Sequence, residues 1–490
     1  MNLRRLLLPN LSVTIWLIFF VALNVSNWRL VMISADGDPA LHRRIGEWMI
    51  ENREVIRTEQ FSHTRFGAEL ISKEWLSEVI FSVMSLAFGW NGVILLAAFL
   101  IATTLWLLHR QLLVNGAEPL LATLLVLMTA FAATTHWLAR PHLVTHLLVV
   151  VFGWLLHDYR NDRCSARRLW ATLPALMCLW TNLHGAFFTG FILIGLFFVG
   201  AIFEKRRDRA VTLAGVLTAC LAASLVNPNG WNLHLQVIGF LRTPELSGMV
   251  NEFRSPNFHS GGAKGLLFEL FAIALLLLVV RPVLAPTEIL LLGVWGYFAL
   301  HSVRNVPVFA LVAAPILARH YQPFLRHPLW LRLSARANNM HTTTGGYVLA
   351  ALAGIGLLVV VSKPSIVGGW ETEILTNRVP VAALEFVRQN PTAVQGEMFN
   401  EYGWGGYLLW AMPERKVFID GRNDFFGKEL CEEFNTVDRT KPGWEAVLEK
   451  YKVGWTLLPP KHPLNALLSL DTGGWTNNYH DEVAVIYSRR

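Results

Sequence analysis

The residues in this sequence that are best suited to chemistry follow its first apolar segment. Asp36, Asp38 and His42 lie in the stretch SADGDPALH at 34–42, directly after apolar residues 11–31. Carboxylates and an imidazole are costly to place at a membrane surface without a use. Either aspartate could act as a general base on an acceptor hydroxyl. Alternatively, the pair could hold a divalent cation, Mg²⁺ or Mn²⁺, that neutralises a diphosphate leaving group.

A structural interpretation of this stretch is a helix start, with Asp38 as the N-cap and Pro39 at the first helical position. It accounts for Asp38 but gives no role to Asp36 or His42, so we favour a functional site. His42 lies four residues after Asp38 and would share its helix face. Substrate contact and an ordinary hydrogen-bonded interfacial histidine are equal alternatives for His42.

A second pair of acidic residues, Glu74 and Glu78, lies in an amphipathic stretch that also contains Trp75. Residues four apart share a helix face. We interpret this stretch as an interfacial helix on the membrane, with Glu78 on its solvated edge. Glu74 is the candidate for a second carboxylate that binds substrate.

Three further candidates for substrate binding stand at turns between apolar segments. Arg140 and Arg304 each lie close to a proline at the end of such a segment. An arginine there either contacts a phosphate or pairs with a carboxylate such as Asp36, Asp38 or Glu252, and the sequence does not separate the two. His184 lies in the stretch NLHG at 182–185, where the glycine permits a tight reversal but does not by itself require the histidine.

The segments that must position these residues have the composition of a polytopic membrane protein. The chain has 490 residues, 53% of them hydrophobic and 16% charged, and a mean hydropathy of +0.40. A soluble protein carries nearer to about 25% charged residues. Apolar runs close to the length of a membrane span recur along the chain. We predict about eleven transmembrane helices, at 11–31, 91–109, 118–135, 142–157, 169–181, 186–203, 211–226, 265–280, 287–301, 306–319 and 346–361.

The basic residues orient these spans. The formal net charge of +7 suggests nucleic-acid binding at first, but much of the basic excess falls at the N-terminus and in the loops after every second span. Cytoplasmic loops carry such an excess. We therefore predict a cytoplasmic N-terminus, with the first span as an uncleaved signal anchor after Arg4 and Arg5, and no nucleic-acid partner. The first external loop, at about 32–90, and the tail would lie on the other side.

Polar residues gather at the turns opposite the basic loops, and five such clusters on one face predict a shared site. Other chemistries are disfavoured. The four cysteines show no paired spacing, so neither a disulfide framework nor a zinc site is indicated. The sequence has no P-loop, G-x-S-x-G, H-E-x-x-H or C-x-x-C motif, which disfavours a P-loop ATPase, a serine hydrolase and a zinc protease.

The tail, 363–490, has an ordinary charge content and predicts a small extracytoplasmic α/β domain beside the transmembrane domain at 1–362. We expect helices at 381–389, 444–451 and 464–470, and strands at 416–419, 454–458 and 482–487. Its densest polar stretch is FIDGRND at 418–424. We interpret Asp420 as part of a turn after a strand and leave Arg422 open as a contact to an anionic ligand.

This pattern resembles the GT-C superfamily of membrane glycosyltransferases, and within it the bacterial homologues of the dolichyl-phosphate-mannose-protein mannosyltransferases. The likeness is one of layout over roughly residues 1–320, and its motifs are short. It rests on Asp36 and Asp38 after the first span, FSHT at 61–64, EWL at 74–76, Arg140 with its proline, and NLHG at 182–185. The resemblance implies that Asp36 or Asp38 is the catalytic carboxylate. This sequence differs from the family in one respect: it has Asp-Gly-Asp where mannosyltransferases often have adjacent acidic residues. The difference leaves open which aspartate acts and whether a metal is used.

We therefore expect a hexosyl- or pentosyltransferase in the bacterial inner membrane, using a polyprenyl-phosphate-linked sugar as donor and a glycan, lipid or protein as acceptor. Two other functions are kept as alternatives: a flippase for a lipid-linked saccharide, and a structural subunit of an envelope assembly complex. A transporter would carry polar residues at mid-membrane depth. The apolar spans and the polar clusters on one face favour the enzyme.

Overall fold

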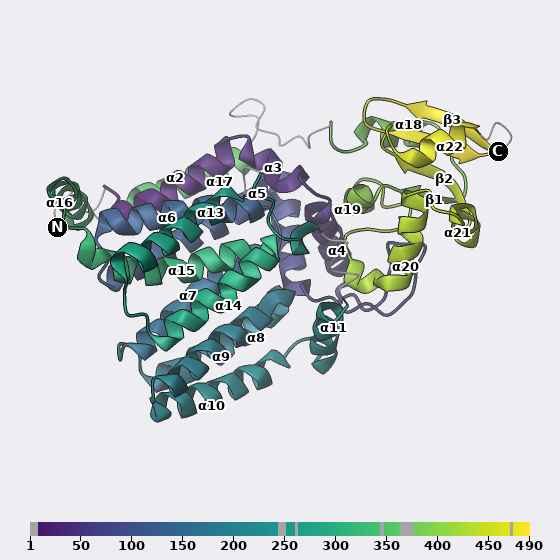
Figure 1. The fold of residues 1–490 in the computed structure, drawn as a ribbon. Coiled ribbons are helices and arrows are strands. Elements are labelled where there is room, and N and C mark those ends of the chain that lie inside the picture. The colour runs from purple at the N-terminus through teal and green to yellow at the C-terminus, as the bar shows by residue number, and fades with distance from the viewer. Residues whose placement is uncertain (1–7, 244–250, 260–262, 344–346, 363–376, 471–473) are drawn as a thin grey trace.

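The computed structural model describes residues 8–243, 251–259, 263–343, 347–362, 377–470 and 474–490. A bundle of long helices forms one part of the molecule, and a smaller domain with the C-terminal sheet lies at one end of it (Figure 1). The residues Arg4 and Arg5 of the expected signal anchor lie outside the described residues. The predicted domain boundary after 362 borders the stretch 363–376, which also lies outside them.

The helical part consists of helices that contain the predicted spans and of shorter helices in the loops. Its members are α2 (Leu11–Val25), α3 (Trp28–Ser34), α4 (Asp38–Asn52), α5 (Trp75–Val114), α6 (Pro119–Ala133), α7 (His142–Arg160), α8 (Ala166–Leu183), α9 (Phe188–Phe203), α10 (Arg207–Ser224), α11 (Trp231–Leu241), α13 (Lys264–Leu275), α14 (Pro286–His301), α15 (Val306–Tyr321), α16 (Pro328–Thr343) and α17 (Val348–Ser362).

Each of the eleven predicted spans overlaps a helix. Within the described residues, four helices are long and apolar enough to cross a membrane, or five if the bent pair α2 and α3 counts as one span. The chain is therefore an integral membrane protein, while the count of eleven stays a prediction. The predicted first span is not one straight helix, because α2 and α3 meet at an angle of 69°.

The predicted first external loop, at about 32–90, is largely helical. Helix α4 begins at Asp38 itself, with Gly37 as its N-cap, so the alternative interpretation of Asp38 as the N-cap is wrong. Asp36 lies before this turn, and its Oδ1 accepts the backbone N–H of Asp38, the first residue of α4, at 3.1 Å. Helix α5 already starts at Trp75 and changes direction at Gly89, where φ is +62°. An L side chain rarely adopts this φ, so the glycine permits the bend between the amphipathic part and the apolar part.

The C-terminal domain is a small α/β unit. Its helices are α18 (Val381–Gln389), α19 (Gly405–Ala411), α20 (Asn423–Asp438), α21 (Trp444–Lys450) and α22 (Pro463–Leu470). In the described part of the tail, the strands β1 (Glu397–Asn400), β2 (Val453–Leu458), β3 (Trp475–His480) and β4 (Val485–Arg489) form one sheet in the order β1-β2-β4-β3. Only the β1–β2 pair is parallel. The three predicted helices and two of the three predicted strands are confirmed.

The predicted strand at 416–419 is not part of this sheet. Val417 instead forms an isolated bridge with Ser62 in the first external loop. The backbone N–H of Val417 donates to the carbonyl of Phe61 at 3.1 Å, and the N–H of His63 donates to the carbonyl of Val417 at 3.0 Å. This extended segment therefore joins the C-terminal domain to the helical part.

Glycines allow the C-terminal domain to approach the Asp36–Asp38 turn closely. A Cβ at Gly406 would collide with the carbonyl oxygen of Gly37, and a Cβ at Gly421 would collide with Oδ1 of Asp38. Helix α19 packs against α4 (Figure 1). The turn that carries Asp38 is thus covered by the backbone of the C-terminal domain.

Candidate active site

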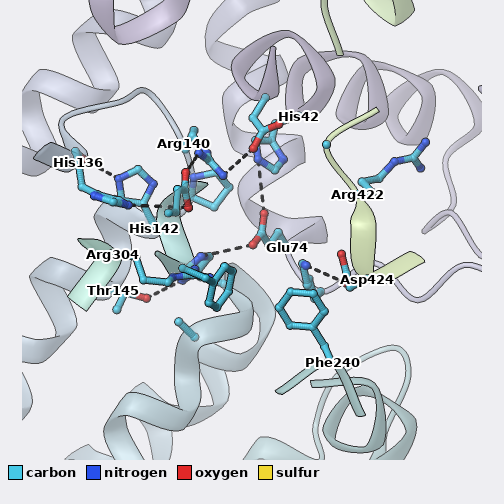
Figure 2. Close-up of a pocket in the computed structure, with 18 of the residues that line it drawn as sticks. His42, Glu74, His136, Arg140, His142, Thr145, Phe240, Arg304, Arg422 and Asp424 are labelled. Carbon is cyan, nitrogen blue, oxygen red and sulfur yellow. Dashed lines mark hydrogen bonds and ion pairs between the residues drawn. The ribbon is translucent and has the colours of Figure 1, made fainter. Parts of the chain in front are cut away.

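The turns that were predicted to be external converge on one polar cavity of ≈ 140 Å³. Six of the seven site residues predicted from the sequence line it: Asp38, His42, Glu74, Arg140, His184 and Arg304. They come from the first loop and from the turns before α7, after α8 and after α14. Asp36 does not line the cavity, and it contacts the site through Arg140. The predicted clusters therefore meet in space (Figure 2).

Arg140 is the centre of an acidic cluster. Its Nη2 lies 2.5 Å from Oδ2 of Asp38, its Nη1 lies 3.1 Å from Oδ2 of Asp36, and Nη1 also pairs with Glu252. Of the two interpretations of Arg140, the structure shows the ion pair. Burial alone would lower the pKa of Arg140, but the charges of Asp38, Glu252 and Asp36 hold it well above its ordinary value.

The same contacts set the charge of the carboxylates around Arg140. Burial raises the pKa of Asp36 to about 6, although Arg140 opposes the change. Burial would also raise the pKa of Glu252, but Arg140 and His136 hold it well below its usual range. Glu252 is thus ionised at neutral pH, whereas the pKa of Asp36 lies close to neutral pH.

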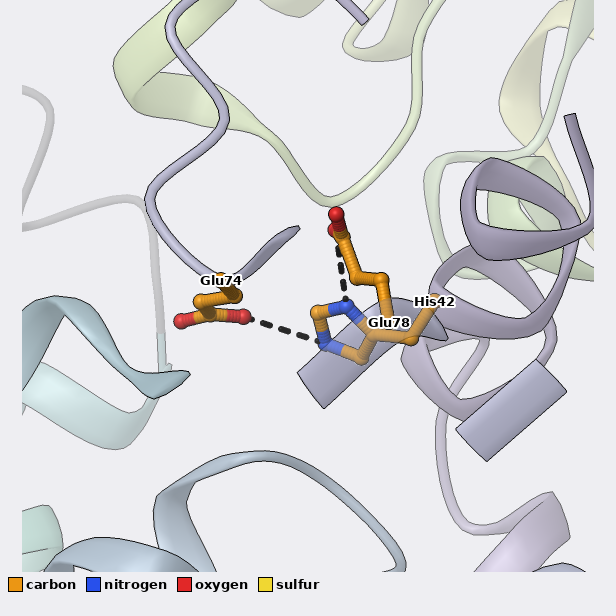
Figure 3. Close-up of side chains that lie close together, drawn as sticks. All are labelled: His42, Glu74 and Glu78. Atoms are coloured by element: carbon orange, nitrogen blue, oxygen red, sulfur yellow. Dashed lines mark hydrogen bonds and ion pairs between the residues drawn. The ribbon is translucent and has the colours of Figure 1, made fainter. Parts of the chain in front are cut away.

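His42 lies between two buried carboxylates (Figure 3). Its Nδ1 is 3.4 Å from Oε1 of Glu78, and its Nε2 is 3.5 Å from Oε2 of Glu74. Burial by itself would lower the pKa of His42, but the hydrogen bond to Glu78 and the charges of Glu74 and Glu78 raise it. Glu78 is 5% exposed and accepts a hydrogen bond from Ser72. The expectation that Glu78 lies on a solvated edge was therefore wrong.

Glu74 also faces His184, whose Nε2 lies 3.4 Å from Oε1 of Glu74. The other ring nitrogen of His184 lies 2.7 Å from the hydroxyl of Thr145, which accepts the indole N–H of Trp180 at 2.9 Å. Because an indole N–H can only donate, the hydroxyl proton of Thr145 is free to point at Nδ1 of His184. The proton of the neutral ring then lies on Nε2 and faces Glu74. Burial and nearby cations hold the pKa of His184 well below its ordinary value, and burial raises that of Glu74.

Arg304 differs from the other basic residues that line the cavity. Arg140, Lys73 and Arg422 form ion pairs with carboxylates. Among the residues that the structure describes, no carboxylate lies within ion-pair distance of Arg304, whose guanidinium stacks 4.4 Å from the ring centre of Phe253. Burial lowers its pKa, but an arginine remains charged at any physiological pH. Arg304 is therefore a cation that is available to a bound anion.

A second cavity, of ≈ 260 Å³, adjoins the first and is mostly apolar. Arg304, Glu74 and His184 line both cavities. The second cavity is otherwise lined mainly by apolar residues, including Phe188, Ile192, Val237, Phe240, Leu241, Phe253, Trp295 and Phe298. The charged groups thus stand at the junction between a polar and an apolar space.

Several residues at the site could not be recognised from the sequence. Lys73 pairs with Asp424 of the C-terminal domain at 2.8 Å. Arg422 pairs with Glu59 at 2.7 Å and with Asp420 at 2.6 Å. Its charge is therefore neutralised by carboxylates of the protein, rather than being free to contact an anionic ligand. The density of polar residues in the stretch FIDGRND was the signal that could have pointed to this wall of the cavity.

A divalent cation at Asp36 and Asp38 stays a prediction. The point on which these carboxylates converge is filled by the guanidinium of Arg140, so the residues in this arrangement do not fit a cation there. His42, Glu74 and Glu78 lie within 4.8 Å of one another. However, the two carboxylates face opposite nitrogens of the ring rather than a common point (Figure 3), as expected around a protonated imidazole.

No protein-family model and no curated protein matches the sequence, but the fold matches solved structures. The archaeal oligosaccharyltransferase AglB from Archaeoglobus fulgidus, in complex with an inhibitory peptide and a dolichol-phosphate, matches with a TM-score of 0.58. The identity is 12%, over 98% of this chain and 74% of that chain. Two other structures of the A. fulgidus oligosaccharyltransferase cover the same shares at 13% identity. One is tethered with an acceptor peptide and the other is the apo form, with TM-scores of 0.55 and 0.54. The chain therefore shares the fold of this archaeal oligosaccharyltransferase.

Proposed function

We propose that this protein is a membrane glycosyltransferase that moves a sugar from a polyprenyl-phosphate carrier to an acceptor outside the cytoplasm. The observation that carries the proposal is the position of Arg304, an arginine without an ion-pair partner among the described residues, at the junction of the polar and the apolar cavity. A lipid-linked sugar has the same sequence of parts: an apolar chain, an anionic phosphate and a polar sugar. The neighbouring AglB structure, which contains a dolichol-phosphate, is consistent with this assignment.

In this proposal the two cavities divide the donor between them. The isoprenoid next to the phosphate would lie in the apolar cavity along Phe240 and Phe298. The phosphate would contact Arg304, which can donate parallel hydrogen bonds to two oxygens. The sugar would then lie in the polar cavity, within reach of Glu74 and His184.

The transfer step needs a base for the acceptor and positive charge for the leaving group. Asp38 is the candidate base, because its carboxylate lines the polar cavity, where it pairs with Arg140. The acceptor hydroxyl would lose its proton to Asp38 and bond to the anomeric carbon, while the bond from that carbon to the phosphate oxygen breaks. The phosphate would leave with the electron pair, stabilised by Arg304. Asp36 is the alternative base, although its contacts with Arg140 and the start of α4 favour a positioning role.

The C-terminal domain contributes one wall of the site in this account. Gly421 and Asp424 line the polar cavity opposite the helical part. An acceptor must therefore enter between the two parts, so the domain would help to select it. We further propose that the site faces the outside of the bacterial inner membrane, with the N-terminus in the cytoplasm.

A flippase is the main alternative. A flippase would differ from a transferase in carrying polar groups along its apolar spans. Glu269 in α13 is one such group. It is fully buried, and its carboxylate oxygens have no hydrogen-bond partner in the described part of the chain. Glu269 does not line either cavity, and the convergence of the external turns favours the enzyme.

An assay in detergent micelles separates the two functions. Purified protein is mixed with an undecaprenyl-phosphate-linked sugar and an extract of envelope glycans, lipids and proteins as acceptors, and the lipid is followed by mass spectrometry. A transferase converts the donor to undecaprenyl phosphate, because the chemistry does not need two membrane leaflets. A flippase leaves the donor unchanged, since a micelle offers no second leaflet.

A further inference from the structure

Three carboxylates share one arginine, Arg140, at the edge of the polar cavity. Asp36 and Asp38 come from the first external loop, and Glu252 comes from the segment after α11. All three bind the guanidinium of Arg140, at 3.1 Å for Asp36 and 2.5 Å for Asp38. Carboxylates that converge from separate segments on one point are a usual way for a protein to hold Mg²⁺ or Ca²⁺.

The backbone around Arg140 fixes its guanidinium at that point. The N–H of Ala139 donates to the carbonyl of Met32 at 2.8 Å, which ties this turn to α3 just before the two aspartates. Pro141 follows, and α7 begins at His142. The side chain of Arg140 is 18% exposed. A guanidinium cannot lose its charge in a protein, so it is a permanent counter-ion for the three carboxylates.

We propose that Arg140 takes the place of a divalent cation in this site and holds the three carboxylates together without a metal. The planar guanidinium binds carboxylates along its edges, whereas Mg²⁺ requires ligands in an octahedron at about 2.0–2.1 Å. The two cannot share the position. A consequence is that the leaving phosphate is neutralised by Arg304 rather than by a bound metal.

The test measures Mn²⁺ binding directly, without donor or transfer, so it can fail independently of the proposed function. Purified full-length protein is titrated with Mn²⁺, and the loss of the free-ion signal is followed by electron paramagnetic resonance. Wild type and Asp38→Asn are expected to take up the same amount. Arg140→Met, which removes the charge, is expected to gain a bound Mn²⁺ that is lost again in Arg140→Met with Asp38→Asn. Arg140→Lys, which keeps a cation, should behave as wild type.

Two results would overturn the proposal. The first is Mn²⁺ binding by the wild type that Asp38→Asn abolishes, because the carboxylates would then be metal ligands with Arg140 present. The second is an Arg140→Met protein that takes up no more Mn²⁺ than the wild type, although its gel-filtration profile and cooperative unfolding transition show that it is folded. The comparison of wild type with Asp38→Asn decides the question even where Arg140→Met does not fold.

Discussion

Nζ of Lys73 lies 2.8 Å from Oδ2 of Asp424, and this ion pair joins the first external loop to the C-terminal domain at the wall of the polar cavity. The side-chain amide of Gln236 in α11 donates to the same carboxylate oxygen at 3.1 Å. Three segments far apart in the sequence therefore meet at Asp424. The site is complete only when the C-terminal domain is docked, so the docking contacts are open to test.

Arg422 provides a second docking contact, through Glu59. It pairs with Glu59 and Asp420, and both of these side chains are fully buried. Removing one partner of a buried ion pair costs roughly 3–5 kcal/mol. We expect Arg422→Met to lower the apparent unfolding temperature and to expose the C-terminal domain to limited proteolysis. The matched control is Arg439→Met at an exposed position, and equal effects of the two variants would contradict the docking role.

Arg304 should bind the carrier phosphate. A hydrogen bond to a charged group contributes about 1.5–3 kcal/mol, so Arg304→Ala should weaken binding of undecaprenyl phosphate by about tenfold to a hundredfold. Arg304→Lys keeps the charge, so its affinity for undecaprenyl phosphate should lie between those of the wild type and Arg304→Ala. Arg326→Ala, at an exposed arginine outside both cavities, is the control. Normal binding by a folded Arg304→Ala protein would leave Arg304 without a role toward the donor.

His42 should make stability depend on pH. Its pKa is raised above the ordinary value of 6.5, so the folded state binds its proton more tightly than the unfolded state. The resulting stabilisation is complete below pH 6.5 and is lost as the pH rises through the folded-state pKa. The difference in unfolding temperature between wild type and His42→Asn should therefore be largest below pH 6.5 and shrink above it. A difference that grows with pH would contradict the charged pair with Glu74 and Glu78. His259→Asn, at an exposed position, is the control.

Topology is tested by reporter fusions. We expect fusions at Arg163, Arg207 and Arg332 to report the cytoplasm, and fusions at Asn257 and Arg439 to report the exterior. The physical reason is the basic excess in the loops of the first group. If the first group reports the exterior, the site faces the cytoplasm and the proposed acceptor class is wrong.

The pattern of turns predicted much of the site. Alternate turns of a polytopic chain lie on one side of the membrane, so the positions of Asp38, Arg140, His184 and Arg304 along the sequence are enough to place them on one face. Hydropathy also predicted where the helices of the bundle lie, and the sheet strands around 454–458 and 482–487 follow from runs of β-forming residues.

The partners of these residues could not be predicted in the same way. Glu78 looks like a solvated residue because an amphipathic pattern gives the polar face of a helix but not what packs on it. His42 and Ser72, which bury Glu78, approach from the preceding loop. The segment 416–419 has the composition of a sheet strand, but it pairs with the first external loop. Strand β3 (Trp475–His480) is mostly polar and half-buried, so it lacks the apolar alternation by which a strand is recognised.

We propose that the carboxylate of Asp38 acts in sugar transfer, and the transfer rate of Asp38→Asn tests this role. A positioned base contributes about a hundredfold to ten-thousandfold in rate. We expect a stably inserted Asp38→Asn protein whose conversion of an undecaprenyl-phosphate-linked sugar falls by a factor in that range. Asp208→Asn, at an exposed position on α10, should convert the donor at the wild-type rate. Near-normal conversion by the double variant Asp36→Asn with Asp38→Asn, at normal expression, would show that neither aspartate is the base and that the loop is structural.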